Sequence, residues 1–309
     1  FVFNIQCIAC VEFINPGLLG SLNEFNARYA LDIENKRDSG VQRRLKRLLQ
    51  PFILRRLKRD VLTELPARTE VTLHIELSEK ERHFYEALRR NALQSIEALQ
   101  KQIHSGGQQH LQVLAEITRL RRACCNPRLI SPEIEISSAK LQAFEELVDE
   151  LIDNHHKALV FSQFVAHLAI VRELLDNKGI AYQYLDGTTS LPKRRKAVNA
   201  FQSGRGDLFL ISLKAGGAGL NLTAADYVVH MDPWWNPAVE NQASDRVHRM
   251  GQKRPVTIYR LIAKDTIEDK IVALHKHKRD LADSLLADGD VSGKMSIRDM
   301  LELLGTPDA

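Results

Sequence analysis

Four polar side chains recur at helical spacing in residues 238–250. Gln242, Asp245, Arg246 and Arg249 stand at positions i, i+3, i+4 and i+7, so on a helix they would share one face. Such a stripe is normally apolar and faces the core. Two arginines on one face fit a polyphosphate, whose charge they would neutralise. The residues leave one alternative open, an exposed surface helix on which Asp245 pairs with an arginine.

A glycine-rich segment lies upstream of this stripe. Residues 214–222 read KAGGAGLNL, with glycines at Gly216, Gly217 and Gly219. A loop of this kind lets backbone N–H groups come close to a phosphate. The same glycines could equally serve tight turns, so the segment by itself is weak evidence for a phosphate site.

The chain lacks the signatures with which P-loop enzymes bind nucleotide and magnesium. A Walker loop needs Gly-Lys followed by Ser or Thr, and the nearest triplet, Gly293-Lys294-Met295, lacks the hydroxyl. No Asp-Glu pair follows an apolar strand to hold Mg²⁺. The arginine pair therefore predicts half of an ATP site, and we expect this chain not to hydrolyse ATP by itself.

Positive charge is concentrated near the N-terminus. The whole chain of 309 residues has a formal net charge of only +4, but residues 36–59 hold ten Lys or Arg and a single acidic residue, Asp38. Such a run is either a solvated helix face or a surface for nucleic-acid phosphates. Charge alone does not choose between them.

The four cysteines predict neither a disulfide framework nor a metal site. Cys7 and Cys10 have zinc-ligand spacing, but no second pair of ligands follows at a suitable distance. Adjacent Cys124 and Cys125 are interpreted as core residues. With no secretory signal and no apolar run of membrane-spanning length, we expect an intracellular, cytoplasmic protein without a metal centre of its own.

The elements that must position these residues alternate in the second half of the chain. Five short apolar strands are predicted, separated by helices, which argues for a parallel sheet covered on both faces. The strands are expected at 158–161, 181–185, 208–212, 227–231 and 256–261. Ligands of such sheets bind beyond the carboxyl ends of the strands. The polar segments after Phe161, Ser212 and Met231 therefore gather at one end.

The first half of the chain is predicted to be mainly helical. Residues 23–62 have apolar positions at helical spacing, and residues 69–77 alternate like a strand or an extended crossing segment. Ser78-Glu79-Lys80-Glu81 is a capping box that begins a helix. Residues 78–125 are predicted to form a helical hairpin. A long helix is expected from Thr266 to about Leu286.

Five of these segments together resemble the Swi/Snf-type ATPases of helicase superfamily 2, in the order of that family's motifs. The final one pairs Trp234-Trp235 with a His-Arg-Met-Gly-Gln ending, which distinguishes it from DEAD-box helicases. In chain order the five are Pro51–Val61 (PFILRRLKRDV) with Glu64-Leu-Pro66, Lys157–Phe164 (KALVFSQF), Leu185–Thr189 (LDGTT), Leu213–Ala225 (LKAGGAGLNLTAA) and Asp232–Gln252 (DPWWNPAVENQASDRVHRMGQ).

The resemblance implies an α/β fold: a RecA-like parallel sheet flanked by helices, the helicase C-terminal lobe, with a mainly helical N-terminal region. It implies four parts: the tail of a first lobe with a basic helical protrusion (1–70), a helical hairpin protrusion and linker (71–136), the second RecA-like lobe (137–275) and a C-terminal helical extension (276–309). The Asp-Pro-Trp-Trp spelling and the lack of an accessory module suggest a bacterial source.

The resemblance also implies roles for individual residues. Arg246 and Arg249 would be arginine fingers, while Gln242, Gly219 and Asn221 would lie near the nucleotide. Trp235 would couple the DNA contacts to the ATP cleft. The residues expected to contact DNA are Ser162, Gln163, Ser212, Lys214, Gly216, Gly217, Trp235, Arg55, Arg56 and Lys58.

The implied function is translocation along double-stranded DNA, independent of base sequence and driven by ATP. ATP and Mg²⁺ would act in the complete two-lobed protein, with the Mg²⁺ ligands on an N-terminal lobe that this chain lacks. RNA polymerase or another DNA-bound protein is an expected partner, a membrane is not, and the protein would be nucleoid-associated. The alternative is a non-catalytic DNA- or protein-binding scaffold derived from a helicase lobe.

Overall fold

The computed structural model describes residues 14–30, 39–52, 65–101, 106–215, 220–274 and 304–305. The chain forms two compact units, one from residues 1–63 and 276–295 and the other from residues 64–275 and 296–309. Each is described by itself. Several predicted residues lie outside the described ranges, namely Cys7, Cys10, Arg55, Arg56, Lys58, Gly216, Gly217, Gly219 and the 293–295 triplet.

The smaller unit contains short helices around an apolar centre. Its elements are α2 (Leu22–Phe25), the π-helical turn η1 (Asn26–Ala30), α4 (Ser39–Leu49) and the 3₁₀ turn η2 (Gln50–Phe52). Leu19, Phe25, Leu45 and Leu49 pack together as its core. Within the described part, residues 23–30 and 39–52 are helical as expected, with a π-helical turn at 26–30 and a 3₁₀ turn at 50–52.

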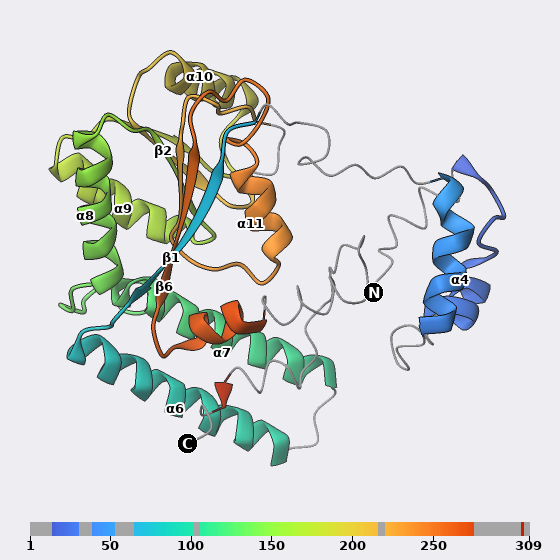
Figure 1. The fold of residues 1–309 in the computed structure, drawn as a ribbon. Helices are drawn as coiled ribbons and strands as arrows, with labels where there is room; N and C mark the ends of the chain where they lie inside the picture. The colour runs from blue at the N-terminus through green and yellow to red at the C-terminus, as the bar shows by residue number, and fades with distance from the viewer. Residues whose placement is uncertain are drawn as a thin grey trace. The chain divides into compact units, whose positions relative to one another are not determined.

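The larger unit is built on one parallel sheet of six strands in the order β1-β6-β5-β2-β4-β3 (Figure 1). All neighbouring strands run parallel. The strands are β1 (Arg68–Ile75), β2 (Ala158–Ser162), β3 (Tyr182–Leu185), β4 (Leu208–Ser212), β5 (Tyr227–His230) and β6 (Val256–Ala263). The predicted fold class is confirmed, and five of the strands coincide closely with the expected ones.

Helices cover both faces of the sheet, as continuous apolar strands require. Every residue of β2 and β4 is buried, and alternate residues face opposite sides. Leu159 and Phe161 pack on the face that α10 and α11 cover, whereas Ala158 and Val160 pack on the face of α8 and α9. The helices are α8 (Ala139–Asp153), α9 (Val165–Asn177), α10 (Leu191–Gln202) and α11 (Pro237–Ser244).

The sixth strand, β1, corrects the expected boundaries. Residues 68–75 pair along their whole length with β6 and form the edge of the sheet. They therefore belong to the lobe that was expected to begin at residue 137, not to a protrusion beginning at 71. The reason is pairing and packing: the β6 edge supplies the ladder, and Leu73 and Ile75 pack into the core beside α8.

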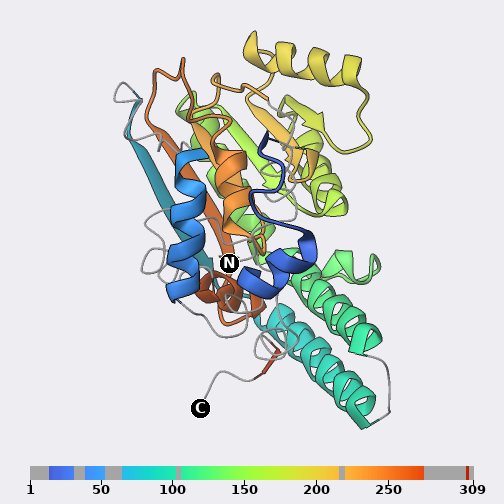
Figure 2. The same cartoon turned by 90° about the vertical axis from the view of Figure 1, so that its right-hand side faces the viewer.

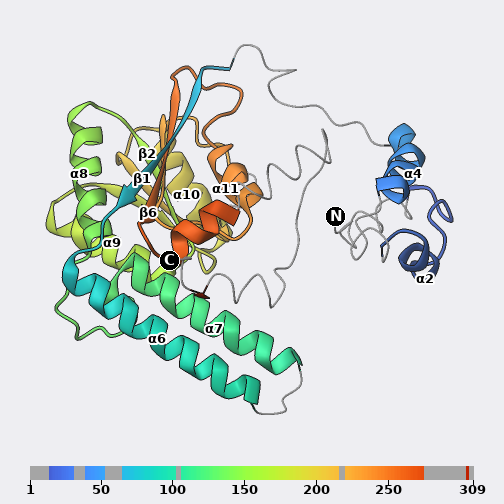
Figure 3. The ribbon, with the colours of Figure 1, turned by 60° about the horizontal axis from the view of Figure 1, so that its bottom comes forward.

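The predicted helical hairpin is confirmed. It consists of α6 (Glu79–Lys101) and α7 (Gly106–Cys125), which lie side by side beyond the carboxyl ends of the strands (Figures 1 and 3). The expected capping box begins α6, with the Ser78 N–H donating to Glu81 Oε2 at 3.0 Å and the Glu81 N–H to Ser78 Oγ at 3.3 Å. A short 3₁₀ turn, η3 (Pro127–Leu129), leads from α7 toward α8.

A last helix begins at Ile267 and is described to residue 274. Thr266 caps it, because its Oγ1 accepts the Glu268 N–H at 3.1 Å. The Ile267 N–H donates to the Tyr85 hydroxyl of α6 at 2.8 Å, which ties this helix to the hairpin. Among the described helices, none combines the length and the apolar character needed to cross a lipid bilayer.

Candidate functional site

The site lies where the sheet reverses its winding direction. Strands β2 and β5 are neighbours, yet the helix after β2, α9, covers one face and the helix after β5, α11, covers the other. Their end loops therefore diverge at the carboxyl edge of the sheet, which is where ligands of open parallel sheets generally bind. Two of the predicted polar segments begin at this point, at Ser162 and at Asp232.

A buried carboxylate, Asp232, joins the two end loops. The Ser162 hydroxyl donates to Asp232 Oδ2, and the Gln163 N–H donates to both carboxylate oxygens at 3.2 and 3.3 Å. The Phe164 N–H in turn donates to Ser162 Oγ at 3.1 Å. Asp232 is 2% exposed. It fixes the backbone of the predicted DNA-contacting loop from the neighbouring strand.

Burial also makes Asp232 sensitive to pH. Burial raises the pKa of its carboxyl to about 6, although Arg121 and the Ser162 hydroxyl oppose the rise. Because the folded carboxyl holds its proton to higher pH than the unfolded one, the free energy of unfolding falls as pH rises from about 4 to about 6, by roughly 3 kcal/mol. Asp232→Asn removes this titration. Urea denaturation of the wild type and of Asp232→Asn between pH 4 and 7 should show this fall in unfolding free energy only in the wild type. If the unfolding free energies of the two proteins change with pH in parallel, Asp232 does not titrate as predicted.

The predicted DNA-contacting residues divide into buried and accessible ones. Ser162 and Ser212 are register partners on β2 and β4 and are only 1% and 3% exposed. The Ser162 hydroxyl is already engaged by Asp232 and both serines are buried, and their contact with phosphate stays a prediction. Gln163 is half-buried and Lys214 is exposed, and these two reach the surface.

The guanidinium of Arg121, near the C-terminus of α7, holds the Trp-Trp loop in place. It stacks on the Trp235 ring at 4.6 Å and approaches the Phe164 ring at 5.7 Å, and it donates to the Pro233 carbonyl. Arg121 is 1% exposed. Trp235, predicted to couple two parts of the site, is therefore attached to the hairpin and to the Ser162–Phe164 loop through one buried cation.

The arginine stripe does not lie on one continuous helix. Helix α11 ends at Ser244, and residues 245–250 form successive turns. The predicted helix to Met250 is thus wrong, and so is the shared face of Gln242 and the arginines. The cause is tertiary: the Arg246 carbonyl accepts the Leu222 N–H at 3.1 Å, and the Val247 carbonyl accepts Gln252 Nε2 at 3.4 Å. The first of these bonds joins the turn to the loop after β4, and the second closes the turn locally.

The two arginines still lie close enough to repel each other. Arg246 is 8% exposed and Arg249 is exposed. Burial and the charge of Arg249 lower the pKa of Arg246, against the opposing effect of Asp245. Like charges in one turn cost free energy that a bound anion would recover. The turn is therefore chemically suited to a phosphate group.

Gln252 fastens this turn to the loop after β4. Its side-chain amide donates to the Ala225 carbonyl at 2.7 Å and the Thr223 carbonyl at 3.3 Å, and Gln252 is 8% exposed. Asn221, predicted to lie near the nucleotide, is exposed on the same loop, and its carbonyl accepts the Gln202 side-chain amide at 3.2 Å. The structure thus brings Asn221 and the arginine turn into one bonded assembly.

The base of α11 is anchored to the sheet by charged pairs. Arg68 of β1 donates to Asn241 at 3.0 Å and lies 3.4 Å from Asp245. Arg260 of β6 donates to the buried Glu240 at 3.0 Å, and Glu240 also accepts the Trp234 N–H. Asp245, which follows α11, therefore pairs with Arg68 of β1. Gln242 is exposed on α11.

Three buried side chains have the chemistry of metal ligands. Donor atoms of Cys125, His167 and Asp232 lie within 4.8 Å of one another. Arg121 lies beside Asp232, and the charge of Lys140 adds to burial in lowering the pKa of His167 to about 3. Burial also raises the pKa of the Cys125 thiol well above its usual range. Two neighbouring cations and a protonated thiol disfavour a metal ion, so we interpret the three as core residues.

Sequence reasoning missed the residues that hold the site together. Asp232, Arg121 and Gln252 make its central contacts, yet only the arginine fingers and loop residues were predicted. A signal existed for Arg121, because it continues at helical spacing the buried stripe of α7 that contains Val113 and Ile117. The hydrogen bonds that join Asp232 to Ser162 and Gln163, and Gln252 to Ala225, connect residues that are 27 to 70 positions apart. No local sequence pattern reveals such contacts.

The sequence of the chain matches two protein-family models. Residues 5–129 match the SNF2-related domain, and residues 139–251 match the helicase conserved C-terminal domain. The putative ATP-dependent helicase/translocase YwqA of Bacillus subtilis is 36% identical over 300 residues, covering 94% of this chain and 32% of that protein. The SWI/SNF-related matrix-associated actin-dependent regulator of chromatin subfamily A member 1 of mouse is 31% identical, covering 96% of this chain and 29% of that protein.

Solved structures extend the likeness to three dimensions. The Sulfolobus solfataricus SWI2/SNF2 ATPase core in complex with dsDNA matches with a TM-score of 0.61 and 31% identity, over 90% of this chain and 59% of that one. The core domain from the same organism gives a TM-score of 0.65 and 30% identity, over 98% and 62%. The chain spans about a third of the length of the curated relatives it matches. The chain belongs to the SNF2-related, Swi/Snf-type family of ATPases and carries its helicase conserved C-terminal domain.

Proposed function

We propose that this chain supplies the second-lobe half of an ATP-driven translocase of double-stranded DNA. The observation that carries the proposal is the bonded assembly at the carboxyl edge of the sheet, in which the Arg246–Arg249 turn is fastened to the loop after β4. The Bacillus relative, called a putative ATP-dependent helicase/translocase, and the Sulfolobus core bound to dsDNA support the assignment.

The arginine turn would face the phosphates of ATP. Arg246 and Arg249 neutralise charge that develops on the γ-phosphate, while Gln242, Asn221 and Gly219 lie along the nucleotide. The mutual repulsion of the two guanidiniums fits an anionic ligand. Mg²⁺ would be held by carboxylates of a first lobe outside this chain, and it supplies charge neutralisation at the β- and γ-oxygens when bound.

The loops after β2 and β4 would contact one DNA strand. Gln163 and Lys214 reach the surface and donate to phosphates, together with the amides of Gly216 and Gly217. Arg55, Arg56 and Lys58 add further phosphate contacts from the basic segment. All of these proposed contacts are with phosphates, which carry no base sequence, so binding would be independent of sequence. Ser162 and Asp232 hold the loop after β2 in place.

Arg121 and Gln252 would couple the two halves of the site. Gln252 connects the arginine turn to the loop after β4, and Arg121 connects Trp235 to the loop after β2. A movement of the arginine turn on lobe closure therefore displaces loops that hold DNA. Repeated closure with each ATP hydrolysed would advance the duplex, past RNA polymerase or another DNA-bound protein.

The test is ATP hydrolysis with and without a duplex. We expect the 309-residue chain alone to be inactive, and the chain preceded by a first RecA-like lobe to hydrolyse ATP at a rate that duplex DNA stimulates. Activity of the chain alone would contradict the split site. Inactivity of both proteins, with duplex binding retained, would favour a non-catalytic scaffold instead.

A further inference from the structure

Helix α10 carries a cluster of positive charge that the proposed translocase mechanism does not use. Lys193, Arg194, Arg195 and Lys196 are consecutive, and Arg205 follows the helix. No acidic residue occurs from residue 190 to 206. All but the half-buried Arg194 are exposed. Figures 1 and 2 place α10 at the end of the larger unit opposite the α6–α7 hairpin.

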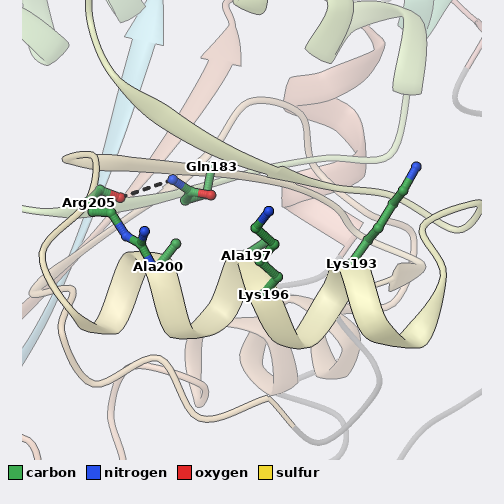
Figure 4. A pocket seen from close by; sticks show the side chains of 6 residues that line it. All are labelled: Gln183, Lys193, Lys196, Ala197, Ala200 and Arg205. Carbon is green, nitrogen blue, oxygen red and sulfur yellow. Dashed lines mark hydrogen bonds between the residues drawn. The ribbon is translucent and has the colours of Figure 1, made fainter.

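Part of this cluster surrounds a surface pocket of about 300 Å³. Lys193, Lys196, Ala197 and Ala200 stand at i, i+3, i+4 and i+7, so the two lysines and two small alanines share one face of α10. Figure 4 shows both lysine side chains extending toward the side where Gln183 lies, with Arg205 at the far end. The alanines leave the pocket open, and the remaining lining residues are polar or positive.

The backbone around Arg205 is fixed in place. Gln183 Nε2 donates to the Arg205 carbonyl at 3.1 Å. Gly206 has φ +88°, and a Cβ there would lie 3.1 Å from the Ala181 carbonyl oxygen, so this turn lies tightly against the start of β3. The nearest acidic residue in sequence, Asp207, is engaged 2.9 Å from Lys157 Nζ. Among the described residues, no carboxylate pairs with Lys193, Lys196 or Arg205.

This arrangement is electrostatically unfavourable for the protein alone. Four cations occupy the first half of a 12-residue helix whose first turn has no acidic residue. The N-terminal end of a helix carries partial positive charge, so the cations of its first turn, Lys193 and Arg194, are disfavoured at a place where an anion would be stabilised. Adjacent like charges add to the cost. Such local conflict is expected at sites that bind a ligand of opposite charge.

We propose that the α10 cluster, defined as Lys193, Arg194, Arg195, Lys196 and Arg205, is a second contact surface for the phosphate backbone of duplex DNA. The inference rests on the proposed function and adds a binding surface outside the end loops of the sheet. The pocket has no aromatic or methionine anchor of the kind that protein partners engage.

The experiment measures how salt weakens binding of the 309-residue chain to a labelled 30-base-pair duplex. Each lost phosphate contact lowers the slope of log K against log salt by about 0.9. The variant Lys193→Gln/Lys196→Gln/Arg205→Gln should therefore reduce the slope by about 2–3. The matched control is Arg128→Gln/Lys178→Gln/Lys264→Gln, which removes the same charge from exposed ion pairs elsewhere and should change the slope by less than about 1.

Every other outcome overturns the proposal. An unchanged slope, or an equal change in both variants, would mean that α10 makes no specific phosphate contact. Binding of the wild type and of the triple variant to poly-glutamate is measured as well. If the triple variant loses this binding while its duplex slope stays unchanged, the cluster is a site for an acidic protein. Failure of the wild-type chain to bind duplex would defeat the DNA part of the proposed function as well, whereas normal wild-type binding with an unchanged variant slope would defeat this inference alone.

Discussion

Arg249→Ala in the two-lobed protein is expected to lower DNA-stimulated ATP hydrolysis by about 10³- to 10⁵-fold, while the Kd for duplex DNA changes less than about twofold. The loss corresponds to about 4–7 kcal/mol of transition-state stabilisation. Arg249 is exposed on the turn after α11, and it is close enough to Arg246 to lower the pKa of that side chain. Its removal should therefore affect catalysis with little effect on stability.

Two further variants make this result specific. Arg249→Lys keeps the charge but loses the planar fork, so it should recover only a small part of the activity. Lys253→Ala removes one exposed positive charge four residues along the chain and should retain near-normal turnover. Steady-state ATP hydrolysis at saturating duplex compares all three. Wild-type turnover in Arg249→Ala would exclude an arginine-finger role.

The second large effect concerns a fully buried ion pair. Lys140, in the first turn of α8, lies 2.5 Å from Glu268 of the last described helix, and both side chains are 0% exposed. Lys140→Met leaves Glu268 buried without its counter-charge, which should lower the free energy of unfolding by about 3–5 kcal/mol. Urea denaturation at pH 7.5 measures the change.

The origin of that loss can be isolated with a double variant. Lys140→Met/Glu268→Gln removes both charges, and glutamine can still accept the Ala263 N–H that Glu268 now accepts at 2.9 Å. We expect it to recover at least about 2 kcal/mol relative to Lys140→Met. The control pair Lys264–Glu76 has a similar separation of 2.8 Å but is exposed, so Lys264→Met should cost less than about 1 kcal/mol. The single variant Glu268→Gln completes the comparison. If the losses of unfolding free energy in Lys140→Met and Glu268→Gln simply add up in the double variant, the two charges are not coupled and the prediction is wrong.

Several features of this lobe could be predicted because their causes are local. The runs at 158–161 and 208–212 are continuously apolar, which suits strands buried on both faces, and they became β2 and β4. Ser78 and Glu81 cap α6 through bonds that span three residues. Adjacent Cys124 and Cys125 are buried at 1% and 0% exposure, as expected for core residues.

Other features depend on partners far along the chain. Residues 69–77 alternate in a way that suits any half-buried extended segment, and only the free edge of β6 makes 68–75 the outermost strand. The stripe from Gln242 to Arg249 has good helical spacing. The helix nevertheless stops at Ser244, because the Arg246 carbonyl accepts the N–H of Leu222 from the distant loop after β4.

The sequence by itself determined the parallel α/β class, the helical hairpin and the types of residue at the strand ends, because periodicity, capping and apolar runs act over a few residues. The tertiary structure decided which of those ends meet and which side chains reach the surface. Sheet order brings Asp232 beside Ser162, and that contact leaves Gln163 and Lys214, rather than the serines, free to face a ligand. Strand register and long-range hydrogen bonds carry this information, and neither has a signature within a short stretch of sequence.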